Sequence, residues 1–149
     1  MKRKMKVLLV DDEEEFVKAL AERLEMRDLS SDIVYDGEGA LSYVENQEPD
    51  VMVLDFKMPG IDGMEVLKKV KEAYPNIEVI MLTGHGTKKD EEEARRLGIF
   101  DYMEKPVDID SLVKRMKDAF RRKLDKYATA ATFAEAGEVE EAKKIYDDK

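Results

Sequence analysis

The sequence predicts an α/β fold in which a parallel β-sheet is covered by helices on both faces. Short runs of apolar residues alternate along the chain with longer stretches whose apolar residues recur at helical spacing. The apolar runs are continuous and do not alternate with polar residues, which is typical of strands buried on both faces of a sheet. Five such strand–helix units predict a parallel sheet with right-handed crossovers.

The expected strands are short, and each is bounded by polar or turn-forming residues. They cover residues 6–10, 32–35, 51–54, 77–82 and 100–103. The run VMVL, ended by Asp55, is the clearest of them because it contains no polar residue.

Apolar stripes predict five helices, over residues 13–27, 37–47, 64–74 and 88–97 and from residue 109 onward. Pro75 favours the end of the third helix, and Gly98 closes the fourth. The stripe of the last helix keeps its spacing through Tyr127, so we expect this helix to continue into an alanine-rich segment. Gly137 should end it, and residues 138–146 should form a second, short helix.

The chain of 149 residues suits one domain of ordinary size followed by a short extension. No repeat and no Gly/Ser-rich linker interrupts residues 1–125, which we interpret as one domain. Residues 126–149 are alanine-rich and then acidic, and we expect a helical C-terminal extension there. This segment is too short for a helix-turn-helix domain. Whether the chain stands alone or is a fragment of a longer protein stays open.

Composition and charge exclude several classes of protein and site. The chain has no cysteine, so disulfides and thiolate metal sites are impossible, and its single histidine argues against zinc. The longest apolar runs have four residues, whereas a membrane-spanning helix needs about 20. A net charge of −9 repels nucleic-acid phosphates. We therefore expect a cytoplasmic protein that binds neither membranes nor nucleic acid.

Chemically active residues follow four of the expected strands, and ligands of open parallel sheets bind outside the carboxyl ends of the strands. Asp11 and Asp12 follow the first strand, Asp55 the third, Thr83 the fourth and Lys105 the fifth. Three carboxylates, one hydroxyl and one ammonium group are thus expected at one edge of the sheet. Singly, each is an ordinary cap or turn residue, but their joint occurrence is specific.

Three neighbouring carboxylates repel one another, and a divalent cation relieves that repulsion. Oxygen ligands with retained waters suit Mg²⁺. A carboxylate can also attack phosphorus and form an aspartyl phosphate. The charge of a transferring phosphoryl group then needs a metal ion, a lysine and a donor hydroxyl, and this edge offers each of them.

Four sequence runs carry a resemblance to a known family: VLLVDDE, VLDFKMPGIDGMEVL, VIMLTGHG and YMEKP. Over residues 5–125 the chain resembles the receiver domain of bacterial two-component response regulators. The resemblance implies a flavodoxin-like (βα)5 sheet with strand order 2-1-3-4-5. It also implies a signalling switch that a histidine kinase or a phosphotransfer protein phosphorylates. Such a switch is not an enzyme acting on a separate substrate, since it catalyses only its own phosphoryl transfer and slow dephosphorylation.

The resemblance also implies roles for individual residues. Asp55 would be the phosphoacceptor. Mg²⁺ would bind to Asp55, directly to Asp12, largely through water to Asp11, and to the backbone carbonyl of Lys57. Lys105 would contact the phosphoryl oxygens.

A second group of residues would respond to phosphorylation or modulate it. Thr83 would hydrogen-bond the phosphoryl group, and Tyr102 would swing inward behind it. The Lys105–Pro106 peptide bond would be cis. The side chains of Lys57 and His85 would modulate the lifetime of the phosphoryl group, or they are solvated loop residues.

Three other functions fit the sequence less well than a signalling switch. A phosphate-ester hydrolase usually has a second acid two residues after its nucleophilic Asp, and that position is Lys57. A flavin-binding electron carrier would need a Ser/Thr/Gly-rich phosphate loop after the first strand, where this chain has Asp-Asp-Glu. An interaction module with a dead site is disfavoured by the complete set of site residues. As a further partner, we expect a second copy of the chain, bound through the tail or the face of helix 88–97, the fifth strand and the last helix.

Overall fold

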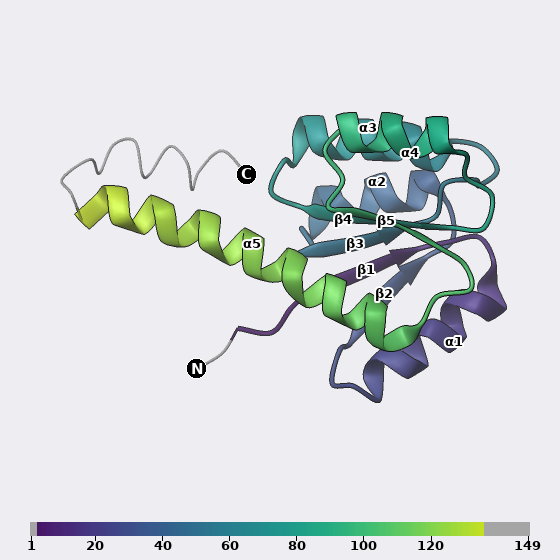
Figure 1. The fold of residues 1–149 in the computed structure, drawn as a ribbon, viewed down its shortest axis with the longest axis horizontal. Coiled ribbons are helices and arrows are strands. Elements are labelled where there is room, and N and C mark those ends of the chain that lie inside the picture. Colours follow the sequence, from purple (N-terminus) through teal and green to yellow (C-terminus); the bar gives the residue numbers. More distant parts are fainter. Residues whose placement is uncertain (1–2, 136–149) are drawn as a thin grey trace.

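The computed structural model describes residues 3–135, with side chains described as far as residue 128. Strands and helices alternate strictly along the chain (Figure 1). In order they are β1 (Val7–Val10), α1 (Glu14–Glu25), β2 (Ser31–Val34), α2 (Gly37–Asn46), β3 (Val51–Leu54), α3 (Gly63–Ala73), β4 (Glu78–Thr83), α4 (Lys88–Arg96), β5 (Asp101–Glu104) and α5 (Ile109–Glu135).

All neighbouring strands pair in parallel, and the sheet has the order β2-β1-β3-β4-β5. The α/β class and the flavodoxin-like strand order predicted above are therefore confirmed. The register sets Val10 beside Leu54, so the residues that follow β1 and β3 start from the same level of the sheet. This alignment brings the ends of the two central strands together.

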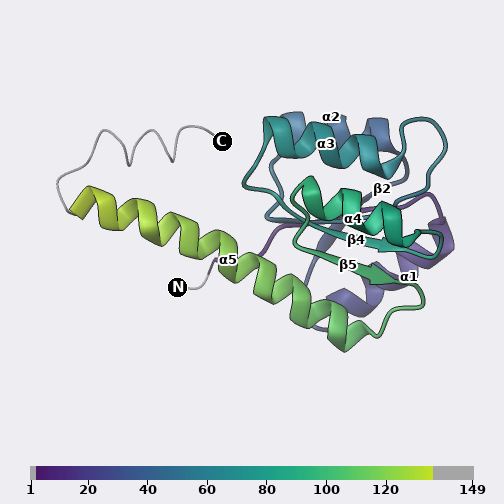
Figure 2. The ribbon, with the colours of Figure 1, turned by 45° about the horizontal axis from the view of Figure 1, so that its top comes forward.

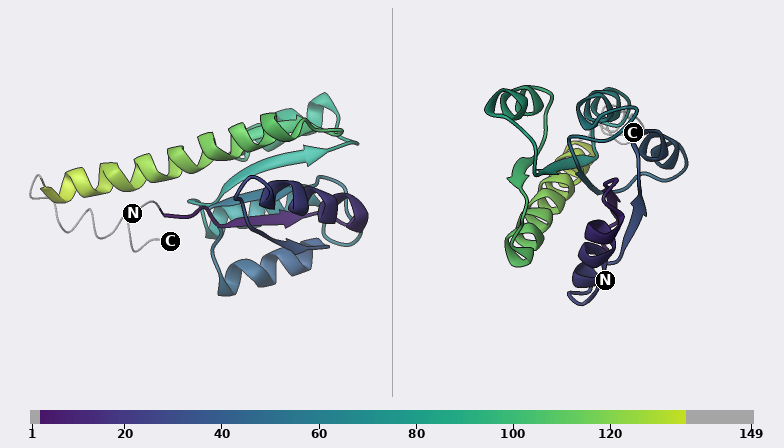
Figure 3. Two further views of the ribbon diagram at one scale, coloured as in Figure 1. Left: turned by 90° about the horizontal axis from the view of Figure 1, so that it is seen from below. Right: turned by 90° about the vertical axis from the view of Figure 1, so that its right-hand side faces the viewer.

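Two apolar layers hold the helices against the sheet, and successive residues of each strand point into opposite layers. In β1, Leu8 and Val10 belong to the apolar cluster that contains residues of α2, α3 and α4, whereas Val7 and Leu9 belong to the cluster that contains residues of α1 and α5. Figure 3 shows these two groups of helices on the two faces of the sheet. Burial on both faces explains why the central strands are continuously apolar.

Element boundaries agree with the prediction to within two residues, and several ends are set by local geometry. Helix α4 buries only Ala94, and a capping box formed by Thr87 and Asp90 fixes its first turn. Gly98 follows it with φ of +98°, a left-handed conformation that glycine adopts without strain. After α1, Asp28 has φ of 61°, a conformation that Asp tolerates better than most residues.

Helix α5 is far longer than its neighbours and runs on into the alanine-rich segment, as predicted (Figure 2). Its first half packs on the sheet through Leu112 and Met116, and its second half projects beyond the strands. The predicted stop at Gly137 and the predicted helix 138–146 lie outside the described residues. Within the described part of the chain, no helix is long and apolar enough to cross a membrane.

Candidate functional site

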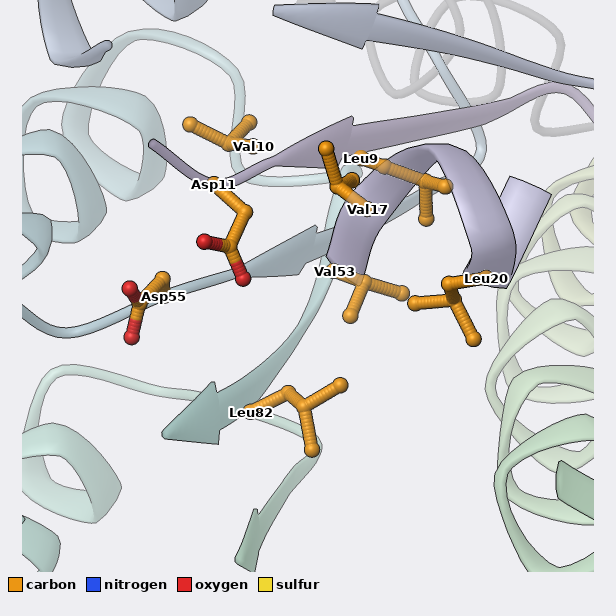
Figure 4. Close-up of a pocket in the computed structure, with 8 residues that line it drawn as sticks. All are labelled: Leu9, Val10, Asp11, Val17, Leu20, Val53, Asp55 and Leu82. Carbon is orange, nitrogen blue, oxygen red and sulfur yellow. The ribbon is translucent and has the colours of Figure 1, made fainter. Parts of the chain in front are cut away.

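The acidic residues predicted to meet at the carboxyl edge of the sheet do meet there. Asp11, Asp12 and Asp55 each offer a carboxylate oxygen, and these oxygens lie within 4.8 Å of one another. Asp11 and Asp55 are almost completely buried, and Asp12 is partly exposed. In Figure 4 the carboxylates of Asp11 and Asp55 face the same space. The structure therefore concentrates three negative charges in a small volume.

The floor of this site is apolar, which deprives the carboxylates of water. Beneath Asp11 and Asp55 the pocket is lined by aliphatic side chains from β1, α1, β3 and β4 (Figure 4), namely Leu9, Val10, Val17, Leu20, Val53 and Leu82. Burial and the neighbouring charge of Asp11 raise the pKa of Asp55 to about 6, although Lys105 opposes the shift. Burial also raises the pKa of Asp11.

Tight backbone packing shapes the loop that follows Asp55. The Gly63 amide donates a hydrogen bond to the Phe56 carbonyl at 2.7 Å. A Cβ atom at Gly63 would lie only 2.1 Å from the Asp55 carbonyl oxygen, so this position requires glycine. Gly60 has φ of +78°, which also favours glycine. Lys57, in the same loop, has an exposed side chain.

Lys105 reaches the acidic cluster from the end of β5, as the sequence predicts. Its ammonium nitrogen lies 2.7 Å from Asp11 Oδ2 and 3.8 Å from Asp55 Oδ2. The same nitrogen lies 2.8 Å from Glu13 Oε1 and 4.3 Å from the centre of the Phe16 ring. Burial opposes ionisation of Lys105, but hydrogen bonds to Asp11 and Glu13 raise its pKa overall. The Lys105–Pro106 peptide bond is cis, as the resemblance implies.

Sequence reasoning missed the contacts of Glu13 and Phe16 with Lys105. Both residues belong to the start of α1, directly after the Asp pair. Glu13 is the residue after Asp12 in the motif VLLVDDE, so the sequence predicts that it lies next to the site. The contact itself was not predicted, because strand order places Lys105 at the same edge but does not say which carboxylates its ammonium group reaches. The contact with Lys105 lowers the pKa of Glu13.

The two residues predicted to act as switches lie side by side behind the acidic cluster. Thr83 ends β4 and is buried, and its hydroxyl accepts a hydrogen bond from the His85 amide at 3.2 Å. The Tyr102 hydroxyl is buried and has no hydrogen-bond partner among the described residues. A Cβ atom at Gly86 would lie 1.5 Å from that hydroxyl oxygen, so glycine makes room for the ring. The His85 side chain is exposed.

The residues present fit a hard divalent cation. Asp11, Glu13 and Asp55 compete for Lys105, and Asp55 Oδ1 is buried without a hydrogen-bond partner in the described part of the chain. Such an oxygen loses hydration without compensation. Oxygen ligands on a partly open edge match the preference of Mg²⁺, and Asp11, Asp12 and Asp55 are the side chains that could hold it.

Comparison with known proteins agrees with this arrangement. The model of the response regulator receiver domain matches residues 7–117, which is most of the chain. The chain belongs to the response regulator receiver family. As a receiver domain, it is a module of two-component signal transduction.

Similar proteins include a full-length response regulator. This receiver domain is 34% identical over 115 residues to the heme response regulator HssR of Staphylococcus epidermidis. The match covers 77% of this chain and 51% of HssR, so the chain spans about half the length of this curated relative.

Solved structures of receiver domains superpose on most of this chain. One from Clostridium thermocellum is 32% identical, with TM-score 0.75, over 80% of this chain and 96% of that one. The receiver domain of Francisella response regulator 1452 is 29% identical, with TM-score 0.74, over 80% and 98%. A CheY-like receiver domain protein from Methanospirillum hungatei is 24% identical, with TM-score 0.79, over 83% and 98%, and shares the fold.

Proposed function

We propose that this receiver domain accepts a phosphoryl group on Asp55 from a histidine kinase or a phosphotransfer protein and then changes its contacts with other proteins. The observation that carries the proposal is the buried, unpartnered oxygen of Asp55 among two further carboxylates and Lys105. A structural acid would have both carboxylate oxygens matched by cations or hydrogen-bond donors, and among the described residues Asp55 Oδ1 has no such partner.

In the proposed step, an Asp55 carboxylate oxygen attacks the phosphorus of a phosphohistidine. A P–O bond forms to Asp55, the P–N bond breaks, and the departing imidazole takes up a proton. Lys105 lies close enough to Asp55 for its ammonium to meet the phosphoryl oxygens after a small movement. The Thr83 hydroxyl, at the end of the adjacent strand, is the proposed donor to another phosphoryl oxygen.

Asp11, Asp12 and Asp55, with the Lys57 backbone carbonyl, are the proposed ligands of Mg²⁺. When bound, the ion supplies positive charge that offsets the repulsion between the carboxylates and the incoming phosphoryl group. Asp11 and Asp12 would fix the position of the ion, and the apolar floor of the site keeps water away from Asp55. The exposed side chains of Lys57 and His85 are proposed to modulate the lifetime of the phosphoryl group.

The proposed output surface consists of α4, β5 and α5. Asp101 on β5 pairs with Arg95 of α4 at 3.5 Å and with Arg115 of α5 at 2.8 Å. These ion pairs connect the three elements, so a movement of Thr83 and Tyr102 beneath them can reach the surface. Phosphorylation would act by biasing this connected element between two arrangements.

We propose that a second copy of the chain is a partner of this surface or of the projecting half of α5. Leu124 of α5 is 37% exposed, and pairing of the projecting helices would cover it. Deleting residues 127–149 should then reduce dimer formation in light scattering with a phosphoryl analogue. We further propose a cytoplasmic location, which is typical of receiver domains. We also propose that this chain does not bind DNA, because its net charge is −9.

The proposal is tested by incubating the protein with acetyl phosphate and Mg²⁺ and measuring its intact mass. The expected result is one added phosphoryl group, which does not form in the presence of EDTA or in the Asp55→Asn variant and which hydroxylamine removes. Undiminished labelling of that variant would refute the assignment of Asp55. A control variant, Glu15→Gln, removes one acid from the nearby helix turn and should be labelled like the unchanged protein.

A further inference from the structure

Helix α1 begins in an unusual way. Its N-cap residue is Glu13, whose side chain makes no capping hydrogen bond, although Ser, Thr, Asp and Asn are the preferred residues there. The Glu13 amide instead donates to Asp11 Oδ1 at 2.9 Å. The Glu13 carboxylate turns away from its own helix and accepts a hydrogen bond from Lys105 at 2.8 Å. The helix therefore gives up a side-chain cap at the position where that side chain contacts the site lysine.

The contacts of Lys105 leave little of its charge for Asp55. An ammonium group has three N–H donors, and two of them go to Asp11 and Glu13 at 2.7 and 2.8 Å. The distance to Asp55 Oδ2 is 3.8 Å, which is too long for a hydrogen bond. In the domain as it stands, Lys105 is thus directed mainly toward the start of α1.

The Phe16 ring closes the remaining side of this arrangement. The Lys105 nitrogen lies 4.3 Å from the ring centre, a distance at which the face of an aromatic ring attracts a cation. Phe16 is one turn after Glu13 on the same helix, so both contacts come from a single rigid element. The Lys105 side chain is 11% exposed, which is consistent with a fixed position.

We propose that Glu13 is a positioning residue: it holds Lys105 against Phe16 in the unphosphorylated domain and competes with a phosphoryl group on Asp55 for the lysine ammonium. The inference rests on the proposed function of Asp55 and adds a determinant of how readily the site takes up that group. A phosphoryl group must draw the charge of Lys105 toward itself, and the Glu13 carboxylate opposes this.

Beryllofluoride, in the presence of saturating Mg²⁺, is the probe that tests the inference, because it occupies the position of the phosphoryl group. Glu13→Gln should bind it about two- to fivefold more tightly than Glu15→Gln, as expected for loss of one partly exposed ion pair. Glu15 is the matched control, because it carries the same charge in the first turn of α1. Among the described residues, Glu15 forms no ion pair, whereas Glu13 pairs with Lys105. Equal or weaker binding by Glu13→Gln would overturn the inference.

Two further variants separate a specific contact from a general effect of charge. Glu13→Asp keeps the charge but shortens the side chain, so it should behave like Glu13→Gln if contact with Lys105 matters and like the unchanged protein if only charge matters. In a Lys105→Ala background, Glu13→Gln and Glu15→Gln should have equal effects. A persisting difference there would refute the role of Lys105.

The same titration distinguishes failure of the inference from failure of the proposed function. If the unchanged protein shows no Mg²⁺-dependent binding of beryllofluoride, the proposed role of Asp55 fails. If the unchanged protein binds and the Glu13 variants match the Glu15 control, the role of Asp55 stands and that of Glu13 is refuted. Mg²⁺ affinity, measured separately, should be equal in the Glu13→Gln and Glu15→Gln variants.

Discussion

The two edges of the sheet both bury acidic residues, but they balance the charge differently. At the carboxyl edge, Asp11 and Asp55 lie beside Asp12, and in the described part of the chain these two buried acids share one lysine, Lys105. At the opposite edge, Asp50 and Glu78 are fully buried, and each is paired with two cations. Buried carboxylates are thus matched by an excess of cations at one edge of the sheet and by too few cations at the other edge.

The opposite edge shows what a structural acid requires. Asp50 lies 2.7 Å from Arg3 and 2.9 Å from Lys123, and it accepts a hydrogen bond from the Lys6 amide at 2.8 Å. Both oxygens of the Asp50 carboxylate therefore have a cation or a hydrogen-bond donor as partner. A buried charge without such partners would destabilise the fold.

Glu78 repeats this pattern at the start of β4. Both of its oxygens accept hydrogen bonds from Arg122, and Lys71 lies 3.9 Å away. Arg122 and Lys123 are consecutive residues of α5, so the two buried acids bind the helix at the point where it leaves the sheet. This edge therefore fixes α5 and is a poor place for a ligand.

The carboxyl edge lacks this balance, and the comparison indicates why. An acid left without matching cations lowers the stability of the fold, and such sites persist where a bound ion or a reaction makes use of them. The surplus of negative charge around Asp55 is what the proposed function requires, whereas the balanced charge around Asp50 serves the fold alone. Substitutions at the two edges should then have opposite effects on stability.

The largest expected effect comes from the balanced edge. Asp50→Asn leaves the buried Lys123 ammonium without its partner, and breaking a buried pair in this way costs about 3–5 kcal/mol. Urea unfolding followed by circular dichroism measures the free energy of unfolding. A loss of less than about 1 kcal/mol, the range of exposed ion pairs, would show that the cluster is not structural.

A smaller effect of opposite sign is expected at the other edge. Asp55→Asn removes one of the crowded charges and should raise the free energy of unfolding by about 1–3 kcal/mol at neutral pH without Mg²⁺. The pKa of Asp55 is raised from 3.8 to about 6 in the folded chain. The folded state therefore binds more protons than the unfolded state between these values.

This difference in proton binding fixes the sign of the pH dependence. The stability of the unchanged protein relative to Asp55→Asn should fall as the pH rises from about 4 to about 6 and then level off. Chemical unfolding of both proteins in EDTA across this range measures the difference. A pH-independent difference, or a less stable Asp55→Asn variant, would contradict the proposed charge surplus.

The smallest effect is expected at an exposed pair that belongs to neither edge. Glu14 and Lys18 lie 3.6 Å apart on α1, and both side chains are about 60% exposed. Glu14→Gln should change the free energy of unfolding by less than about 0.5 kcal/mol. A change as large as that of Asp50→Asn would mean that burial does not account for the contrast between the two edges.

The sequence predicts the carboxyl edge well because the rule that places it is general. Once the strands are recognised as parallel, residues such as Asp55 and Lys105 that follow different strands must meet at one edge. No such rule indicates Asp50 or Glu78. Asp50 takes its cations from the N-terminal segment and α5, and Glu78 takes its cations from α3 and α5. Helical spacing alone does not say which charged residue of a helix faces the end of a sheet. The contact between Glu13 and Lys105 was missed for a different reason: strand order places both residues at one edge but does not say which side chains meet there.

Titration with Mg²⁺, followed by NMR of the backbone amides, tests the contrast between the two edges most directly. We expect saturable shifts around Asp12 and Asp55, with a dissociation constant in the millimolar to sub-millimolar range. Asp12→Ala should weaken this Mg²⁺ affinity most. Amides around Asp50 and Glu78 should not move, because their charges are already matched. The absence of saturable shifts at the carboxyl edge, or equal shifts at both edges, would contradict this contrast.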